Sequence, residues 1–195
     1  MYYRRTGPVP RPGTSRRRLL LCLTLPLLAF TAAADNGYRG IPYKAPTPIS
    51  VEGATTLHFA DDVKKLIKSS NVVLINVSPL TLSPPDDNGN RIWIPKRGKT
   101  MYNIPGSVWL PNVGYQSLDA QIRGYLEDNL HKLSDGNKER PLLFYCTADC
   151  WMSWNTVKRV SRELGYSRVY WYPSGIDGWM EQQFETEVAT PLPFN

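Results

Sequence analysis

Two cysteines four positions apart, Cys146 and Cys150, are the residues of this chain best suited to covalent chemistry. An apolar run over residues 141–145 is typical of a strand that ends at Cys146, and helical spacing begins near Trp154 after a polar loop. At such a junction the first N–H groups of the helix have no partner within it and point into the loop, where they stabilise a thiolate or a bound anion. We therefore predict that Cys146 is a nucleophile.

The loop after Cys146 is compatible with several reactions. Main-chain amides from Thr147 to Trp151 are placed to cradle a thiolate and an anionic sulfur donor, so that Cys146 holds a persulfide. Cys150 then resolves a persulfide or sulfenate on Cys146, or the two sulfurs close a reversible disulfide. A structural disulfide without turnover is the simpler alternative and stays open.

The side chains of this loop favour a ligand of low charge. Asp149 lies in the loop, and no Lys or Arg occurs between Cys146 and Trp154. Because a carboxylate repels anions and raises the pKa of a nearby thiol, thiosulfate and phosphate are unfavourable substrates. Trp151 and Trp154 are expected to form the aromatic rim of a wider mouth. We predict catalytic roles for Cys146 and Cys150, and substrate binding by Thr147, Ala148, Asp149, Trp151 and Trp154.

Histidines are too few to suggest a metal centre. His58 and His131 are the only two, and each lies in an apolar-periodic or helix-flanking context that is typical of a structural residue. Neither is close to the cysteines in sequence, so histidine-assisted cysteine catalysis is not indicated. We expect no metal and no cofactor.

Residues 1–34 have the pattern of a cleaved export signal. They contain six arginines and no acid before an uncharged apolar run at residues 19–30, and small residues follow at 32–34. We predict a mature chain that begins near Asp35 and has no stable membrane anchor. The Sec route is favoured, with a twin-arginine signal or an uncleaved anchor as alternatives.

The basic charge of the chain belongs mostly to this signal. The full chain has 23 Lys and Arg against 17 Asp and Glu, so without the six arginines the mature chain is formally neutral. Nucleic-acid binding is therefore not indicated.

The mature chain is expected to be an extended arm at residues 35–50 followed by one domain at 51–195. A strand within 51–58 precedes a surface helix at 60–68, and the nearly continuous aliphatic run at 71–77 predicts a strand buried on both faces. Residues 78–102 are a long insertion, in which Trp93 and Ile94 either contact a partner or fold back onto the domain.

Strands and helices alternate through the rest of the domain. Spacing predicts a short strand before Pro111, a helix at 118–133, a helix at 154–164 and a strand at 169–172, with a last helix near 176–183. This alternation predicts an α/β fold around a mainly parallel central sheet.

The order of these motifs resembles that of the rhodanese (sulfurtransferase) domain. Residues 75–78 correspond to a family Ile-Asp-Val-Arg strand, 103–107 to a His-Ile-Pro-Gly-Ala segment, 144–146 to the strand that ends in the catalytic Cys, and 174–179 to a Gly-Gly-x-x-x-Trp turn. The resemblance covers roughly residues 50–185. It implies a three-layer α/β fold, a persulfide on Cys146, and Asp177 facing the cysteine loop.

A narrower resemblance is to periplasmic rhodanese-like proteins associated with pyrroloquinoline-quinone (PQQ)-dependent alcohol catabolism, which carry a Cys-x-x-Cys-Trp signature. Here three residues, not two, separate Cys146 from Cys150, and Trp151 follows. The resemblance implies a periplasmic protein that acts on a small sulfur-containing or thiol substrate. Its implied partner is a PQQ-dependent alcohol dehydrogenase or the cytochrome of that enzyme.

Three functions follow from these patterns. The first is sulfur transfer or a related reaction at Cys146. The second is thiol–disulfide exchange with a partner in the periplasm. The third is a noncatalytic module that supports a quinoprotein dehydrogenase through residues 78–102 and the tryptophan rim.

Overall fold

A computed structural model of the 195-residue chain describes residues 1–2, 7 and 37–194. The chain divides into a unit of residues 1–34 and a unit of residues 35–195, and all the helices and strands lie in the second. The apolar run and the small residues of the predicted export signal fall outside the described residues. Within the described ranges, no helix combines the length and the apolar character that a membrane span requires.

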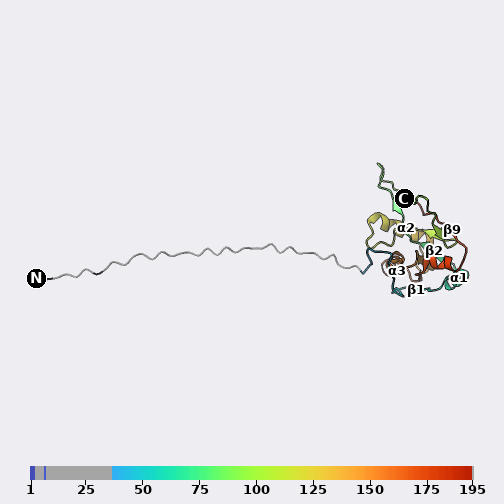
Figure 1. Ribbon diagram of the computed structural model, residues 1–195, viewed down its shortest axis with the longest axis horizontal. Coiled ribbons are helices and arrows are strands. Elements are labelled where there is room, and N and C mark those ends of the chain that lie inside the picture. Colours follow the sequence, from blue (N-terminus) through green and yellow to red (C-terminus); the bar gives the residue numbers. More distant parts are fainter. Residues whose placement is uncertain (3–6, 8–36, 195) are drawn as a thin grey trace. The chain divides into compact units, whose positions relative to one another are not determined.

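A five-stranded parallel sheet forms the centre of this unit (Figure 1). Its order is β1 (Thr55–Thr56), β8 (Val169–Tyr172), β7 (Leu142–Tyr145), β2 (Val73–Asn76) and β6 (Val108–Trp109). All four residues of β7 are fully buried, because strands and helices cover it on every side. The residue that follows β7 therefore emerges from the most rigid part of the fold.

Helices cover both faces of the sheet. The helices are α1 (Ala60–Ser69), α2 (Ala120–Ser134), α3 (Trp151–Arg162) and α4 (Gly175–Glu181). Alternate side chains of the strands pack with residues of α2 and α3 in one core cluster and with residues of α1 and α4 in another. This arrangement confirms the predicted three-layer α/β fold.

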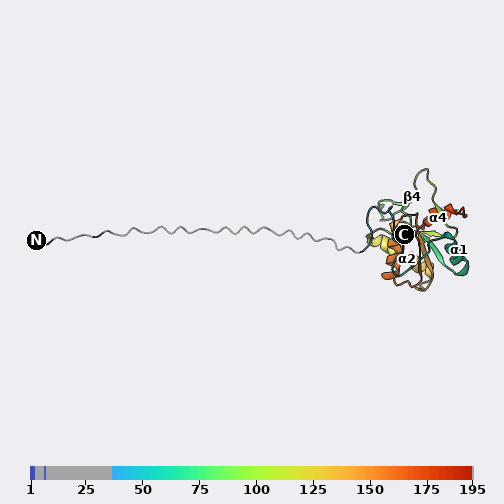
Figure 2. The ribbon, with the colours of Figure 1, turned by 60° about the horizontal axis from the view of Figure 1, so that its bottom comes forward.

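The insertion at 78–102 is more ordered than a structureless loop. It contains an antiparallel pair, β3 (Thr81–Leu82) and β4 (Trp93–Ile94), from which a loop extends beyond the rest of the fold (Figure 2). The Trp93 ring lies 5.4 Å from the ring of Phe194, and its indole N–H donates to the Leu192 carbonyl at 2.9 Å. Trp93 therefore folds back onto the domain, whereas Ile94 is exposed.

Two local expectations needed correction. Helix α3 begins at Trp151, three residues earlier than its apolar spacing predicted, because Cys150 already takes the extended N-cap conformation. A further antiparallel pair, β5 (Tyr102–Asn103) with β9 (Glu187–Val188), joins the end of the insertion to the C-terminal tail. The sequence pattern predicted neither strand of that pair, since both are only two residues long.

Candidate functional site

Cys146 and Cys150 lie together at the carboxyl end of β7 and are joined by a disulfide. Cys146 follows the strand directly, Cys150 is the N-cap of α3, and their Cα atoms are 6.2 Å apart. Both residues are buried, with exposed fractions of 1% and 6%. The structure therefore brings the two predicted catalytic residues into direct contact and shows them in their oxidised form.

Ser78 is the nearest polar side chain to Cys146 from another strand. Its hydroxyl donates to the Cys146 sulfur at 3.5 Å, and its main-chain N–H donates to the Asn76 carboxamide at 2.8 Å. Asn76 is in turn fixed by donating to Asn103 at 2.8 Å. In the reduced protein this hydroxyl is positioned to donate to a Cys146 thiolate, an interaction that lowers the pKa of a thiol.

Sequence reasoning did not identify Ser78 as a site residue. A signal was present, since Ser78 follows β2 directly and β2 is paired with β7. Residues that follow neighbouring parallel strands meet at the same edge of the sheet.

Two amides of the predicted anion cradle are used by the protein itself in this disulfide form. The Ala148 N–H donates to the Asp177 carboxylate at 3.0 Å, and the Trp151 N–H donates to the Tyr43 carbonyl at 2.8 Å. The expectation that Asp177 faces the cysteine loop is confirmed. A donor anion has to compete with the Asp177 carboxylate for one of these amides.

A cation reaches the loop from the N-terminal arm. The Lys44 ammonium donates to the Ala148 carbonyl and lies 3.9 Å from the nearer carboxylate oxygen of Asp177. The loop sequence contains no such cation, and the arm–loop contact is long-range, so it could not be recognised from the sequence alone. Lys44 offsets the charge of Asp177, while Asp149 adds a further negative charge to the exposed side of the loop.

Trp151 and Trp154 do not form an open rim. Their rings meet edge to face at 5.3 Å, and their indole N–H groups donate to the carbonyls of Pro46 at 3.1 Å and Ser50 at 3.2 Å. The two tryptophans instead hold the arm against the first turn of α3.

Two glycines allow backbone to approach the cysteine loop closely. A Cβ on Gly175 would lie 2.7 Å from the carbonyl carbon of Cys146, and a Cβ on Gly114 would lie 2.6 Å from Cα of Met152. Gly175 also has a φ of +54°, which L side chains rarely adopt. The position of the loop between β7 and α3 therefore depends on these two positions being glycine.

No acid–base residue of ordinary pKa adjoins Cys146 from β7. Burial raises the pKa of Tyr145 far above its usual value, so its phenol stays protonated and donates to Ser107 at 2.8 Å. Burial also raises the pKa of Tyr172 to about 12. Over the described residues, no group of three or more His, Cys, Asp or Glu side chains is arranged to hold a metal ion.

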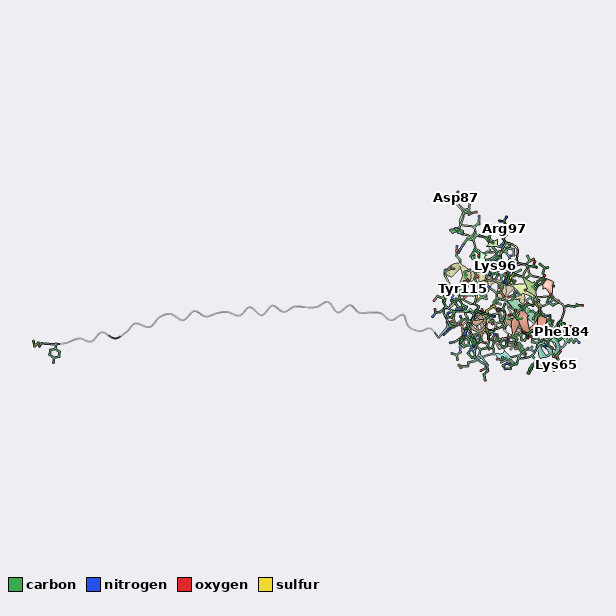
Figure 3. All side chains as sticks on the ribbon, in the orientation of Figure 1. Lys65, Asp87, Lys96, Arg97, Tyr115 and Phe184 are labelled. Carbon is green, nitrogen blue, oxygen red and sulfur yellow. A yellow bond between two sulfur atoms is a disulfide. The ribbon has the colours of Figure 1, made fainter. Side chains whose placement is uncertain are left out.

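A surface hollow of about 400 Å³ lies on the other face of the sheet. It opens between α1, the turn at residues 104–105 and residues 179–185, and its walls include Lys64 and Phe184. The cysteine loop contributes nothing to its lining. Figure 3 shows Phe184 near α1, close to the labelled Lys65.

Comparisons with known proteins agree with this architecture. Residues 59–182 match the sequence family described as the Rhodanese-like domain. No curated protein matches the chain.

Solved structures of similar fold include three proteins of sulfur metabolism. The thiosulfate sulfurtransferase of Pseudomonas aeruginosa is 14% identical with a TM-score of 0.46, and the match covers 73% of this chain and 22% of that one. The polysulfide-sulfur transferase homodimer of Wolinella succinogenes is 18% identical with a TM-score of 0.44, covering 71% and 80%. The 3-mercaptopyruvate sulfotransferase of Escherichia coli is 16% identical with a TM-score of 0.42, covering 73% and 55%. The chain thus spans about a fifth of the length of the first of these.

Replacing Gly175 by Ala is expected to displace the Cys146 carbonyl and to lower the free energy of unfolding by about 1 to 3 kcal/mol, because it combines a left-handed backbone with a backbone clash. Urea unfolding measures the loss. Gly124→Ala is the matched control, since its Cβ meets nothing within 4 Å in the middle of α2. Equal stabilities of the two variants would contradict the close approach at Gly175.

Proposed function

The chain belongs to the family of rhodanese-like domains, and from that premise we propose that it is a sulfurtransferase or a related thiol enzyme with Cys146 as nucleophile and Cys150 as resolving residue. The observation that carries the proposal is the Cys146–Cys150 disulfide at the strand–helix junction. It requires the second sulfur to reach the first without any rearrangement of β7 or α3.

The small size of the disulfide ring favours a chemical role. A disulfide stabilises mainly by restricting the unfolded chain, and a ring closed over four residues restricts it little. In the chain-entropy account such a ring contributes about 2 kcal/mol, against about 4.7 kcal/mol for a loop of about 100 residues. A pair selected only as a staple would be expected to span more of the chain.

The proposed reaction has two steps. The Cys146 thiolate attacks the outer sulfur of a persulfide or other sulfane-sulfur donor, a new S–S bond forms on Cys146, and the remainder of the donor leaves as its thiolate. The Cys150 thiolate then attacks the Cys146 sulfur of this persulfide and releases hydrosulfide. The sulfane sulfur is thereby reduced while the two thiols are oxidised to the disulfide.

Two outcomes complete the cycle. A protein dithiol or a small thiol reduces the disulfide and restores both cysteines. Alternatively, an acceptor nucleophile takes the outer sulfur of the persulfide before Cys150 attacks, and Cys146 returns to the thiolate directly.

The charges near the loop indicate the class of donor. Asp149 and Asp177 bring two carboxylates to the loop against the single ammonium of Lys44. A donor of low charge, such as an alkyl persulfide or a small thiol-derived polysulfide, is therefore favoured over the dianion thiosulfate.

The disulfide also supports a second candidate function, thiol–disulfide exchange with an exported partner. In this reaction no sulfane sulfur is involved, and Cys146 and Cys150 pass their oxidising equivalents to a partner dithiol. We assign either reaction to the periplasm, on the basis of the N-terminal export pattern in residues 1–34.

Replacing Cys150 by Ser is expected to trap the persulfide. Reduced protein treated with an alkyl persulfide donor should then gain the mass of one sulfur atom on Cys146, whereas the unaltered protein should form the disulfide and release hydrosulfide. Intact-mass spectrometry and a colorimetric hydrosulfide assay measure the two products.

Cys146→Ser is the matched control, and it should show neither the mass gain nor hydrosulfide. A Cys150→Ser protein that never gains sulfur from any sulfane donor, while the unaltered disulfide still exchanges with dithiols, would favour the second candidate function.

We also propose that the insertion supports binding to a PQQ-dependent alcohol dehydrogenase or its cytochrome. The loops beside β4 expose Ile92 and Ile94 together with a basic turn at residues 96–99. Figure 3 shows Lys96, Arg97 and Asp87 at the outer end of this projection. A surface of this kind suits an acidic patch on a partner protein.

Replacing Lys96, Arg97 and Lys99 together by Glu is expected to weaken binding to the purified dehydrogenase by about tenfold or more at low salt, with a smaller effect at high salt. Interferometry with the immobilised dehydrogenase measures the affinity. The control replaces three exposed lysines on helices, Lys65, Lys68 and Lys132, by Glu and changes the net charge equally. Equal losses in the two variants would indicate a general charge effect and would exclude docking through the insertion.

A further inference from the structure

The N-terminal arm crosses the cysteine loop as an antiparallel strap, defined here as residues 39–50. The Ala45 N–H donates to the Asp149 carbonyl at 2.9 Å, and the Trp151 N–H donates to the Tyr43 carbonyl at 2.8 Å. These two hydrogen bonds bracket Cys150, which lies opposite Lys44 in the strap. The strap therefore covers one of the two sulfur-bearing residues with its backbone.

Side chains of α3 hold the strap at its two ends. The Asn155 carboxamide accepts from the Arg39 N–H at 3.0 Å and donates to the Arg39 carbonyl at 2.9 Å. The indole N–H groups of Trp151 and Trp154 donate to strap carbonyls beyond the crossing point. The first turns of α3, which begin beside Cys150, are thus the surface on which the strap lies.

Tyr43 is the main apolar anchor of the strap. Its ring packs against the core and lies 5.4 Å from the ring of Tyr115, and its hydroxyl accepts from the Gln116 N–H at 3.0 Å. The other contacts are mostly hydrogen bonds, and no residue of the strap is buried. Ile41 and Ile49 are 87% and 82% exposed.

A segment held in this way opens at a lower cost than the core. Local opening is easiest where few apolar contacts are buried and backbone hydrogen bonds lie near solvent. Strand β7, by contrast, is buried along its whole length. Lifting of the strap is therefore separable from unfolding of the sheet.

We infer that the strap is a gate over the Cys146–Cys150 disulfide, and that external thiols reach the disulfide only when the strap has lifted. With the strap in place the two cysteines are 1% and 6% exposed, whereas an attacking thiolate has to approach a sulfur in line with the S–S bond. In the open form, attack forms a mixed disulfide and releases the other cysteine as a thiolate. A second thiolate then displaces the first as its own disulfide and leaves both cysteines reduced.

The gate controls access to the thiol chemistry proposed above, but its test requires no sulfur donor. The rate at which dithiothreitol reduces the disulfide depends on how often the strap opens, whatever reaction the cysteines perform. Faster reduction in a strap variant that never transfers sulfur would support the gate and contradict the proposed function, so the two claims fail separately.

Tyr43→Ala is the strap variant and Tyr43→Phe its matched control. Loss of the packed ring is expected to raise the second-order rate of disulfide reduction by about tenfold or more. Tyr43→Phe keeps the ring and should remain within about threefold of the unaltered protein, since it loses one hydrogen-bond acceptor. Quenched samples followed by intact mass give the rates, and circular dichroism verifies that each variant is folded.

Hydrogen exchange in the unaltered protein provides a test that does not depend on any variant. The Ala45 and Trp151 amides, which donate across the strap, should exchange at a common opening rate that is well above that of the β7 amides. Strap amides protected as strongly as those of β7 would overturn the gate. So would equal reduction rates for folded Tyr43→Ala and Tyr43→Phe.

Discussion

The covalent bond between the sulfurs of Cys146 and Cys150 is the constraint on which the rest of the site depends. It joins the end of the most deeply buried strand to the N-cap of α3, so the intervening three residues have little freedom. Gly175 and Gly114 allow neighbouring backbone to approach on both sides of this seam. The chemistry of the site is therefore determined by whether this bond is open or closed.

Electrostatics modulate the site more weakly than this geometry does. The Lys44 and Asp177 side chains are 66% and 44% exposed, and an ion pair so accessible to water contributes at most about 1 kcal/mol. The Ser78 hydroxyl acts on Cys146 within the protein interior, where screening by water is weak. For a thiolate at position 146, the buried hydroxyl and the helix N-terminus are consequently more important than the surface charges.

Much of the fold was predictable because its central elements are locally marked. The apolar runs that became β2, β7 and β8 are continuous, and the stripe that became α2 repeats with helical spacing. The two cysteines were recognisable as a pair from their position at a strand–helix junction. Asp177 followed from the order of the motifs.

What the sequence could not predict are contacts between segments distant in the chain. The strap lies on α3 through residues more than one hundred positions apart, such as Trp151 and Pro46, and no local pattern encodes that pairing. For the same reason Trp151 and Trp154 were taken for an open rim, and the short pair β5 and β9 was not predicted. The start of α3 was placed too late because the apolar spacing does not include its first turn.

The reduction potential of the Cys146–Cys150 disulfide tests the central claim most directly. It is measured by equilibrating the protein with defined ratios of reduced and oxidised dithiothreitol and counting free thiols by intact mass. If the pair takes part in turnover, its potential should lie above about −300 mV, where cellular thiols are able to reduce it. A potential well below that of inert structural disulfides would show that the bond is a permanent staple and would contradict this account.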